Sequence, residues 1–157
     1  MYKRQVLFVC LGNICRSPAA EAIFLDLINK KGLNDCFIVD SAGTGSWHIG
    51  KKADTRMRIA SQKRGVEILS RARQINSNDF EKFNYIVAMD DSNFQNIIDL
   101  KSRESLSDFA SIKKIQNFRS IFQEIEVPDP YFGGDEGFNH VLDILEDSVS
   151  GFLDTIC

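Results

Sequence analysis

The 157-residue sequence has four cysteines, two histidines and only three prolines. No two cysteines have CxxC spacing, and no histidine lies at ligand spacing from one. This argues against a zinc site and against the disulfide framework of a secreted domain. No apolar run approaches the ~20 residues that a bilayer-spanning helix needs. The sequence also lacks internal repeats, low-complexity tracts and flexible linkers, so residues 1–157 are expected to form a single domain.

Charge of one sign is not in large excess. Lys and Arg number 19 against 22 Asp and Glu, which gives a formal net charge of −3. Such a chain has no general attraction to nucleic acid or to an anionic membrane, so neither is expected as a partner. The apolar run at residues 6–11 is too short for a secretion signal, and Asn13 and Arg16 interrupt its continuation. A cytoplasmic location is expected.

Four short apolar runs predict strands at residues 5–10, 37–41, 85–89 and 112–118. All but the last are continuous rather than alternating, as in parallel strands that are buried on both faces. Helical patterns lie between them. The first opens at Ser17 and Pro18, an N-cap and N1 pair, and stops before Gly32. Others run over about 54–65 and from near Asp91.

The last helix has the clearest pattern, with acidic residues at its start that favour the helix dipole. Its apolar stripe comprises Phe138, Val141, Leu142, Leu145, Val149, Phe152, Leu153 and Ile156. Strands that alternate with helices predict an α/β fold, a three-layer sandwich with a four-stranded parallel sheet flanked by helices on both faces. Ligands in such folds bind beyond the carboxyl ends of the strands, where a loop enters a helix.

The loop after the first predicted strand has the composition of a phosphate site. Cys10 and Arg16 bracket five residues that can curl around a tetrahedral anion, with backbone N–H groups pointing inward and the next helix adding its positive end. Gly12 permits a backbone turn closed to other residues. The guanidinium of Arg16 offers a planar fork to phosphate oxygens. The positive field favours a thiolate nucleophile at Cys10, and Ser17 is placed to donate to its sulfur.

A cysteine followed six residues later by an arginine is a weak signal, and alone it favours the interpretation of Cys10 as the buried end of a strand. The context favours chemistry, because the pair closes a strand, frames Gly12 and Asn13, and leads into a capped helix.

The segment VCLGNICRSP at residues 9–18 resembles the signature of the low-molecular-weight protein tyrosine phosphatases almost letter for letter. The likeness continues, in order, through DSAGT at 40–44, Trp47, ARQ at 72–74, MDDSN at 89–93 and VPDPY at 127–131. The larger tyrosine phosphatases usually have His directly before the cysteine, where this chain has Val9.

This resemblance implies that Cys10 attacks phosphorus and forms a phosphocysteine intermediate, and that Arg16 binds the phosphate oxygens. Asp129 then corresponds to the general acid and base; without the loop at Cys10, a turn aspartate between prolines would explain it better. The substrates implied are phosphotyrosine-containing proteins, the product is inorganic phosphate, and no metal or other cofactor is needed. The phosphate-binding residues implied are Leu11, Gly12, Asn13, Ile14, Cys15, Arg16 and Ser17.

The substrate cleft implied by the family is aromatic. Tyr131 and Phe132 resemble its wall, with Ile14 at its base, and Trp47 is expected to face them, although a core anchor under a loop explains Trp47 about equally well. Such a slot fits a phosphotyrosine ring better than phosphoserine. Asn13 and Ser41 resemble the pair that supports the phosphate loop.

Three further residues carry more limited expectations. Asp90 is interpreted as a helix cap rather than a catalyst. Cys15 is a candidate for a reversible disulfide with Cys10, as in the family, or else a buried thiol. Family members often have His where this chain has Ser70, so the detail of the loop support is open.

Three other functions are considered. Thioredoxin-coupled arsenate reduction uses the same loop but needs two further cysteines, and residues 75–111 contain none. Protein-arginine phosphatases of this type have Thr in place of Ile14, which leaves more room for a guanidinium group. A non-catalytic phosphate-binding module would be expected to lack Cys10 or Asp129, and both are present.

Overall fold

The centre of the fold is a four-stranded parallel sheet with the strand order β2-β1-β3-β4. The computed structural model describes residues 2–157. The strands are β1 (Arg4–Cys10), β2 (Phe37–Gly43), β3 (Tyr85–Ala88) and β4 (Ser111–Lys114). Cys10 at the end of β1 pairs with Gly43 of β2, and Val9 pairs with Ala88 of β3. The carboxyl ends of β1, β2 and β3 therefore meet at one edge of the sheet, above which the loop from Cys10 begins.

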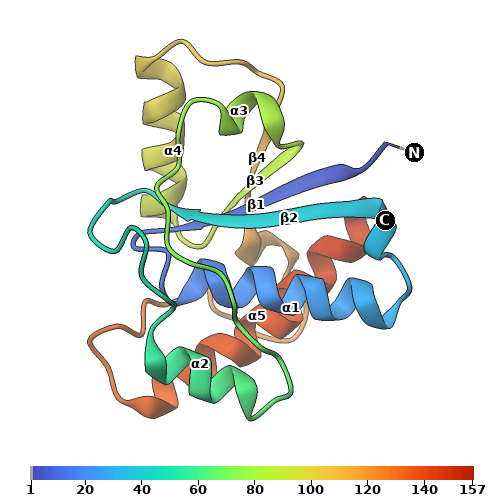
Figure 1. Cartoon of the computed structure of the whole chain (residues 1–157), viewed down its shortest axis with the longest axis vertical. Coiled ribbons are helices and arrows are strands. Elements are labelled where there is room, and N and C mark those ends of the chain that lie inside the picture. The colour runs from blue at the N-terminus through green and yellow to red at the C-terminus, as the bar shows by residue number, and fades with distance from the viewer. Residues whose placement is uncertain (1) are drawn as a thin grey trace.

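Helices cover both faces of the sheet, which confirms the predicted three-layer sandwich. Figure 1 shows α1 (Arg16–Lys30), α2 (Thr55–Gln62) and α5 (Asp135–Ile156) on one side. The short α3 (Asp79–Lys82) and α4 (Asp91–Arg103) lie on the other. Two 3-10 turns, η1 (Asn34–Cys36) and η2 (Ile115–Phe118), complete the elements. None of the helices in residues 2–157 is long and apolar enough to cross a membrane.

Each face of β1 has its own core. Val6 and Phe8 belong to the larger one, in which the ring of Phe8 lies 5.8 Å from Phe24 of α1 and 6.2 Å from Phe152 of α5. Leu7 and Val9 point into the smaller core under α3 and α4. Side chains alternate across a strand, so two covered faces require the continuous apolar run that the sequence shows. All eight residues of the predicted α5 stripe are buried.

Three boundary predictions were wrong. The fourth strand ends at Lys114, and the rest of the predicted run is the 3-10 helix η2. The first helix begins at Arg16, with Cys15 rather than Ser17 at the N-cap position. The helix expected over about 54–65 ends at Gln62, although its predicted start holds, because Asp54 caps it by accepting from the Arg56 amide.

Candidate active site

The loop that joins β1 to α1 is anchored to the end of β2. The Cys10 carbonyl accepts from the Thr44 amide at 2.9 Å, and the Leu11 carbonyl accepts from the Gly45 amide at the same distance. These bonds continue the β1–β2 ladder into the loop. The loop is thereby held directly above the sheet edge, with the N-terminus of α1 beside it.

The Cys10 sulfur lies among donors. The Asn13 amide donates to Cys10 Sγ at 3.3 Å, and the Ser17 hydroxyl lies 3.0 Å from the same atom. The first turn of α1, which contributes Arg16 and Ser17, adds its partial positive charge. The Ser17 hydroxyl also accepts from the Asn13 side chain and lies 3.3 Å from the Ala42 carbonyl, so it serves the loop rather than capping the helix.

The tight turn of the loop is made by Asn13, not by Gly12 as the sequence suggested. Asn13 has φ of +57°, whereas Gly12 is not in the left-handed region. Asparagine tolerates this conformation because its short amide forms local hydrogen bonds. Gly12 instead leaves room for His48, because a Cβ there would lie 3.0 Å from the His48 ring and the ring would have to shift.

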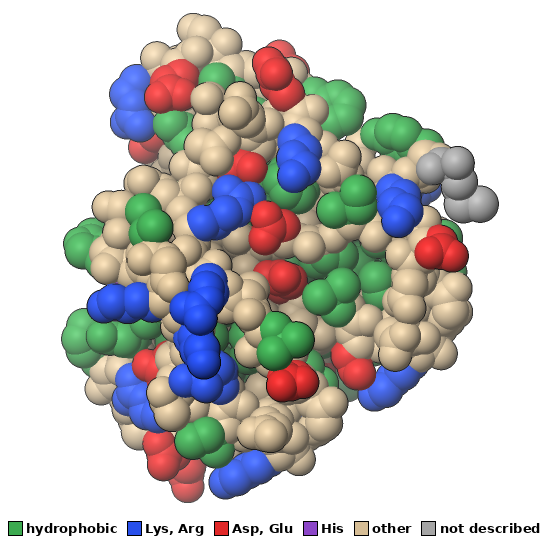
Figure 2. All heavy atoms as spheres, in the orientation of Figure 1, with side chains coloured by type: hydrophobic (Ala, Val, Ile, Leu, Met, Phe, Trp, Pro, Cys, Tyr) green, Lys and Arg blue, Asp and Glu red, His purple; other side chains and the backbone are tan. Residues whose placement is uncertain are grey.

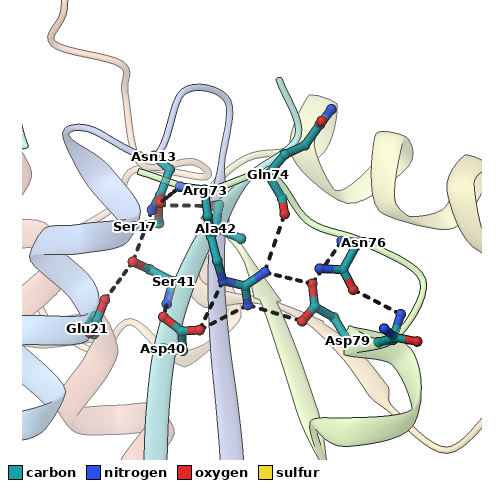
Figure 3. A network of polar contacts seen from close by, with 11 residues as sticks. Asn13, Ser17, Glu21, Asp40, Ser41, Ala42, Arg73, Gln74, Asn76 and Asp79 are labelled. Carbon is teal, nitrogen blue, oxygen red and sulfur yellow. Dashed lines mark hydrogen bonds and ion pairs between the residues drawn. The ribbon is translucent and has the colours of Figure 1, made fainter. Parts of the chain in front are cut away.

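Asn13 is fixed by three partners that come from different segments. The side-chain nitrogen of Asn13, Nδ2, donates to Ser17 Oγ at 2.8 Å and to Ser41 Oγ at 3.0 Å. Its side-chain oxygen accepts from the backbone amide of Arg73 at 2.9 Å. Figure 3 shows how these groups converge. Ser41 in turn donates to Glu21 of α1 at 2.6 Å. The structure thus places Asn13 and Ser41 in contact, and it extends the pair into a network.

Arg73 links this network to the far side of the sheet. Its guanidinium forms ion pairs with Asp40 on β2 and with the buried Asp79 at the start of α3, each at 3.0 Å. Figure 3 shows the guanidinium between the two carboxylates. Both contacts raise its pKa against the opposing effect of burial, which is the largest single contribution. The segment around Arg73, which supports the loop, is therefore held in place by two ion pairs.

The position expected to hold a supporting histidine has Ser70. Burial of the neighbouring Glu21 carboxyl raises its pKa to about 7, while the hydroxyls of Ser41 and Ser70 act in the opposite direction. The charge of Arg73 also lowers the pKa of Glu21, but its contribution is the smallest of those named. The support of the loop therefore contains a carboxyl group that titrates near neutrality.

Arg16 lies at the floor of the site, where its side chain is only 3% exposed. It donates to Asp90 at 2.5 Å, to the Val127 carbonyl at 3.1 Å and to Asp129 at 3.4 Å. Burial opposes its charge, but Cys10 and Asp90 offset this and the pKa of Arg16 is raised. A charged guanidinium is therefore fixed beside the sulfur, with the carboxylate of Asp129 next to it.

One cleft of about 200 Å³ collects most of the predicted site residues. Trp47 is 67% exposed and lines it, so the core-anchor interpretation is wrong. Its ring instead covers the backbone at Gly45. The lining residues are Cys10, Leu11, Gly12, Ile14, Cys15, Arg16, Trp47, His48, Asp129, Tyr131 and Phe132. The cleft therefore has a thiol and a guanidinium at its base and aromatic rings at its rim. The predicted supports Asn13 and Ser41, and Ser17, which was predicted to bind phosphate, are buried and do not line the cleft.

Cys15 also lines the cleft and is buried. Burial raises the pKa of its thiol, and the nearby Asp54 adds to the rise. Cys15 is consequently a neutral thiol near pH 7. Cys15 and Cys10 line the same cleft, as the predicted disulfide requires. Both residues are free thiols in this structure.

The segment that carries Asp129 is held by α2. Arg56 donates to the carbonyls of Tyr131 at 2.8 Å and Gly133 at 3.3 Å, and it stacks 4.6 Å from the ring centre of Phe138. Its partner Asp54 donates its own amide to the Ile14 carbonyl at 2.8 Å. The first residues of α2 thus connect the phosphate loop to the acid segment.

Sequence reasoning missed several of these residues. Asp90 caps α4 as expected, but it also pairs with Arg16. Glu21 follows Ser17 by four residues on α1, so helical spacing could have placed both on one face. Arg73 lies in the ARQ segment of the family likeness, but its partner Asp40 lies on another element. The carbonyls that Arg56 holds, those of Tyr131 and Gly133, lie more than seventy residues away and leave no local signal.

Comparison with known proteins agrees with this geometry. A family model described as low molecular weight phosphotyrosine protein phosphatase matches residues 5–157. A phosphatase of that name from Schizosaccharomyces pombe is 42% identical over 153 residues, which cover 97% of this chain and 96% of the relative.

Solved structures give the same result. A protein tyrosine phosphatase from Entamoeba histolytica has a TM-score of 0.92 at 42% identity, over 98% of this chain and 97% of that one. A Drosophila arginine phosphatase has a TM-score of 0.90 at 35% identity, with 96% of both chains covered. Since the matches span nearly the whole length, this chain belongs to the low molecular weight phosphotyrosine protein phosphatase family.

Proposed function

We propose that this protein hydrolyses phosphotyrosine in proteins, with Cys10 as the nucleophile, Arg16 as the phosphate-binding cation and Asp129 as the general acid and base. The observation that carries the proposal is the single cleft that contains all three side chains. The family supports phosphoproteins as the substrate class.

In the first step the thiolate of Cys10 attacks phosphorus, and the bond from phosphorus to the phenolic oxygen breaks. The proton for the leaving phenolate comes from Asp129 in its protonated form. Arg16 and the backbone amides of residues 11–17 hold the phosphoryl oxygens, whose charge grows in the transition state. Ser17 Oγ, 3.0 Å from the sulfur, donates to the thiolate.

In the second step water attacks the phosphocysteine. Asp129, now ionised, takes a proton from that water, the sulfur–phosphorus bond breaks, and inorganic phosphate leaves. The Ser17 hydroxyl stabilises the thiolate as it departs. The Asn13, Ser41 and Arg73 network keeps the loop in one conformation throughout, which reduces the reorganisation needed in each step.

Selectivity for tyrosine follows from the shape of the cleft. Trp47 and Tyr131 form walls against which a flat ring packs, and Ile14 at the base is only 8% exposed. A phosphoserine side chain is too short to fill this space while its phosphate lies at Arg16.

The test is hydrolysis of p-nitrophenyl phosphate and of a phosphotyrosine peptide by the wild type, Cys10→Ser and Asp129→Ala. Cys10→Ser is expected to be inactive, and Asp129→Ala to lose roughly 10²–10⁴-fold in turnover, the usual contribution of a general acid. Activity is expected to persist in EDTA. An inactive wild type that still binds phosphate would indicate a non-catalytic module, and full activity in Cys10→Ser would contradict the proposal.

Protein-arginine phosphatase activity is the second candidate, because an arginine phosphatase is among the similar structures. Ile14 argues against it, since its branched side chain narrows the base of the cleft. Phosphoarginine and phosphotyrosine peptides of matched sequence separate the two activities. Ile14→Thr is expected to shift the ratio of kcat/KM toward phosphoarginine, and a wild type that prefers phosphoarginine would overturn the choice.

A further inference from the structure

Positive charge is concentrated in one segment of an otherwise acidic chain. Residues 51–73 contain eight Lys and Arg against two Asp and Glu, whereas the whole chain has 19 against 22. The basic residues are Lys51, Lys52, Arg56, Arg58, Lys63, Arg64, Arg71 and Arg73. Figure 2 shows blue side chains gathered over α2 and the segment that follows it.

Part of this charge is not neutralised within the molecule. Arg56, Arg64 and Arg73 form ion pairs with carboxylates. Within residues 2–157 no carboxylate lies within ion-pair distance of the remaining five, namely Lys51, Lys52, Arg58, Lys63 and Arg71. The hydrogen bonds of Arg58 and Arg71 go to neutral oxygens. Their charge is therefore available to a partner.

Three of these cations line one depression of about 230 Å³, which we call the basic hollow: Lys52, Arg58 and Arg71, with Glu67 as the single carboxylate on its wall. Exposed Leu69 contributes an apolar edge. A depression with three cations and one anion has a net positive potential, and its guanidinium groups suit carboxylates.

The basic hollow is built onto the wall of the cleft. The Gly50 amide donates to the Ala72 carbonyl and the Ala72 amide to the Lys51 carbonyl, both at 2.8 Å. The Arg71 guanidinium holds the Gly50 carbonyl at 3.0 Å. Because His48 lines the cleft two residues before Gly50, the cations and the cleft wall form one connected unit.

The short distance between the cleft wall at His48 and the basic hollow suits a peptide that continues out of the cleft. A hydrogen bond from the Lys51 amide to the His48 carbonyl closes a tight turn, so these Cα atoms lie within about 7 Å of each other. An extended peptide advances about 3.3 Å per residue. Lys52 of the basic hollow directly follows this turn, so a carboxylate a few residues from the phosphotyrosine is expected to reach it.

We propose that the basic hollow binds acidic side chains that flank the phosphotyrosine of a protein substrate, so that the enzyme prefers acidic phosphotyrosine segments. This inference rests on the proposed function. The cations also raise the rate of encounter with such substrates, since complementary charge steers association. A single exposed ion pair contributes little, but several cations at one place act together.

The test compares phosphotyrosine peptides of equal length that carry Asp and Glu on one side of the tyrosine, on the other side, or Asn and Gln throughout. We expect kcat/KM for at least one acidic peptide to exceed that of the neutral peptide about three- to tenfold. The excess is expected to shrink when NaCl rises from about 50 to about 500 mM, because salt screens exposed charges.

The variant Lys52→Glu/Arg71→Glu is expected to abolish or invert this preference while kcat/KM for p-nitrophenyl phosphate stays unchanged. Lys52→Gln/Arg71→Gln is less disruptive. It is expected to bring the ratio of kcat/KM for the acidic peptide to kcat/KM for the neutral peptide near one. The matched control is Lys3→Glu/Lys31→Glu, which changes the net charge equally near the other end of β1 and α1. It is expected to keep the preference.

Equal rates on acidic and neutral peptides in the wild type would overturn the inference, as would a preference that survives in Lys52→Gln/Arg71→Gln. So would a loss of equal size in the Lys3 and Lys31 control, which would assign the effect to net charge alone. Binding to phosphatidylserine vesicles that depends on Lys52 and Arg71, without a peptide preference, would assign the surface to membranes instead. Inactivity on every phosphotyrosine substrate, with phosphoarginine hydrolysed, would refute the proposed function rather than the charge preference.

Discussion

Asp90 holds the guanidinium of Arg16 by an ion pair of 2.5 Å while its other carboxylate oxygen caps helix α4 by accepting from the Asn93 amide at 2.7 Å. One side chain thus ties the phosphate-binding cation of the first loop to the start of a helix more than seventy residues away. The pair is largely buried, and Arg16 has a fixed orientation because Val127 contributes a further acceptor.

The two roles of Asp90 predict different effects for two substitutions. Both substitutions remove the charge that faces the buried Arg16, so both are expected to lower thermal stability. Asp90→Asn retains a good N-cap, so Asp90→Ala is expected to be about 1 kcal/mol less stable than Asp90→Asn. Both are expected to lower kcat/KM for p-nitrophenyl phosphate roughly tenfold, or about 1.4 kcal/mol of transition-state stabilisation. Thermal melts and steady-state kinetics measure these effects. Wild-type kinetics in Asp90→Asn would show that the ion pair does not position Arg16.

The hydrogen bonds of Arg56 predict that this residue affects proton donation by Asp129. Arg56→Met removes the bonds to the Tyr131 and Gly133 carbonyls, which leaves the Asp129 segment less well held. We expect kcat to fall roughly tenfold for phenyl phosphate, whose leaving group needs a proton, and much less for p-nitrophenyl phosphate. A series of aryl phosphates measures this dependence. Arg58→Met is the control, because the side-chain hydrogen bonds of Arg58 within the described residues go to Ala53 and Thr55 and not to the Asp129 segment. An equal fall for both substrates would contradict the positioning role of Arg56.

Glu21 predicts a pH dependence of stability. Its folded-state pKa of about 7 lies above the ordinary value of 4.5, so the folded protein binds the proton more tightly than the unfolded chain. The resulting stabilisation is fully present below pH 4.5 and is lost as pH rises through 7, a change of about 3 kcal/mol. Glu21→Gln is expected to remove this slope.

Urea denaturation at several pH values measures the slope in the wild type, in Glu21→Gln and in Glu104→Gln, an exposed control. The free energy of unfolding of the control is expected to follow the wild type. If Glu21→Gln keeps the same decline between pH 5 and 8, then another group is responsible and Glu21 is charged in the folded protein.

Cys15 predicts a pH-dependent protection against oxidation. Peroxide converts the Cys10 thiolate to a sulfenic acid, and attack by Cys15 then forms the disulfide and releases water. Since burial raises the pKa of Cys15, closure is expected to accelerate as pH rises, roughly tenfold per unit while the thiolate is scarce. Dithiothreitol is expected to restore activity in the wild type and not in Cys15→Ser. Equal recovery in both would exclude this role.

Local signals in the sequence were sufficient for much of the fold. Continuous apolar runs predicted strands with two covered faces, and the stripe from Phe138 to Ile156 predicted α5. These patterns work because burial of a strand or helix depends on its own periodicity. The fourth strand was predicted too long because Ile115 and Phe118, which are three residues apart, fit one face of a 3-10 turn equally well.

The amino-acid sequence by itself determined where the loop from Cys10 to Ser17 lies, because a strand, a tight turn and a helix N-terminus follow one another along the chain. The bonds that hold this loop to Ser41, Thr44 and Arg73 come from the tertiary structure. Only the tertiary structure decided what surrounds Arg16: Asp90, Val127 and Asp129 are brought to it by parallel strands whose carboxyl ends meet at one edge. Contacts between residues more than seventy positions apart leave no local periodicity. Their geometry therefore becomes visible only when the sheet is assembled.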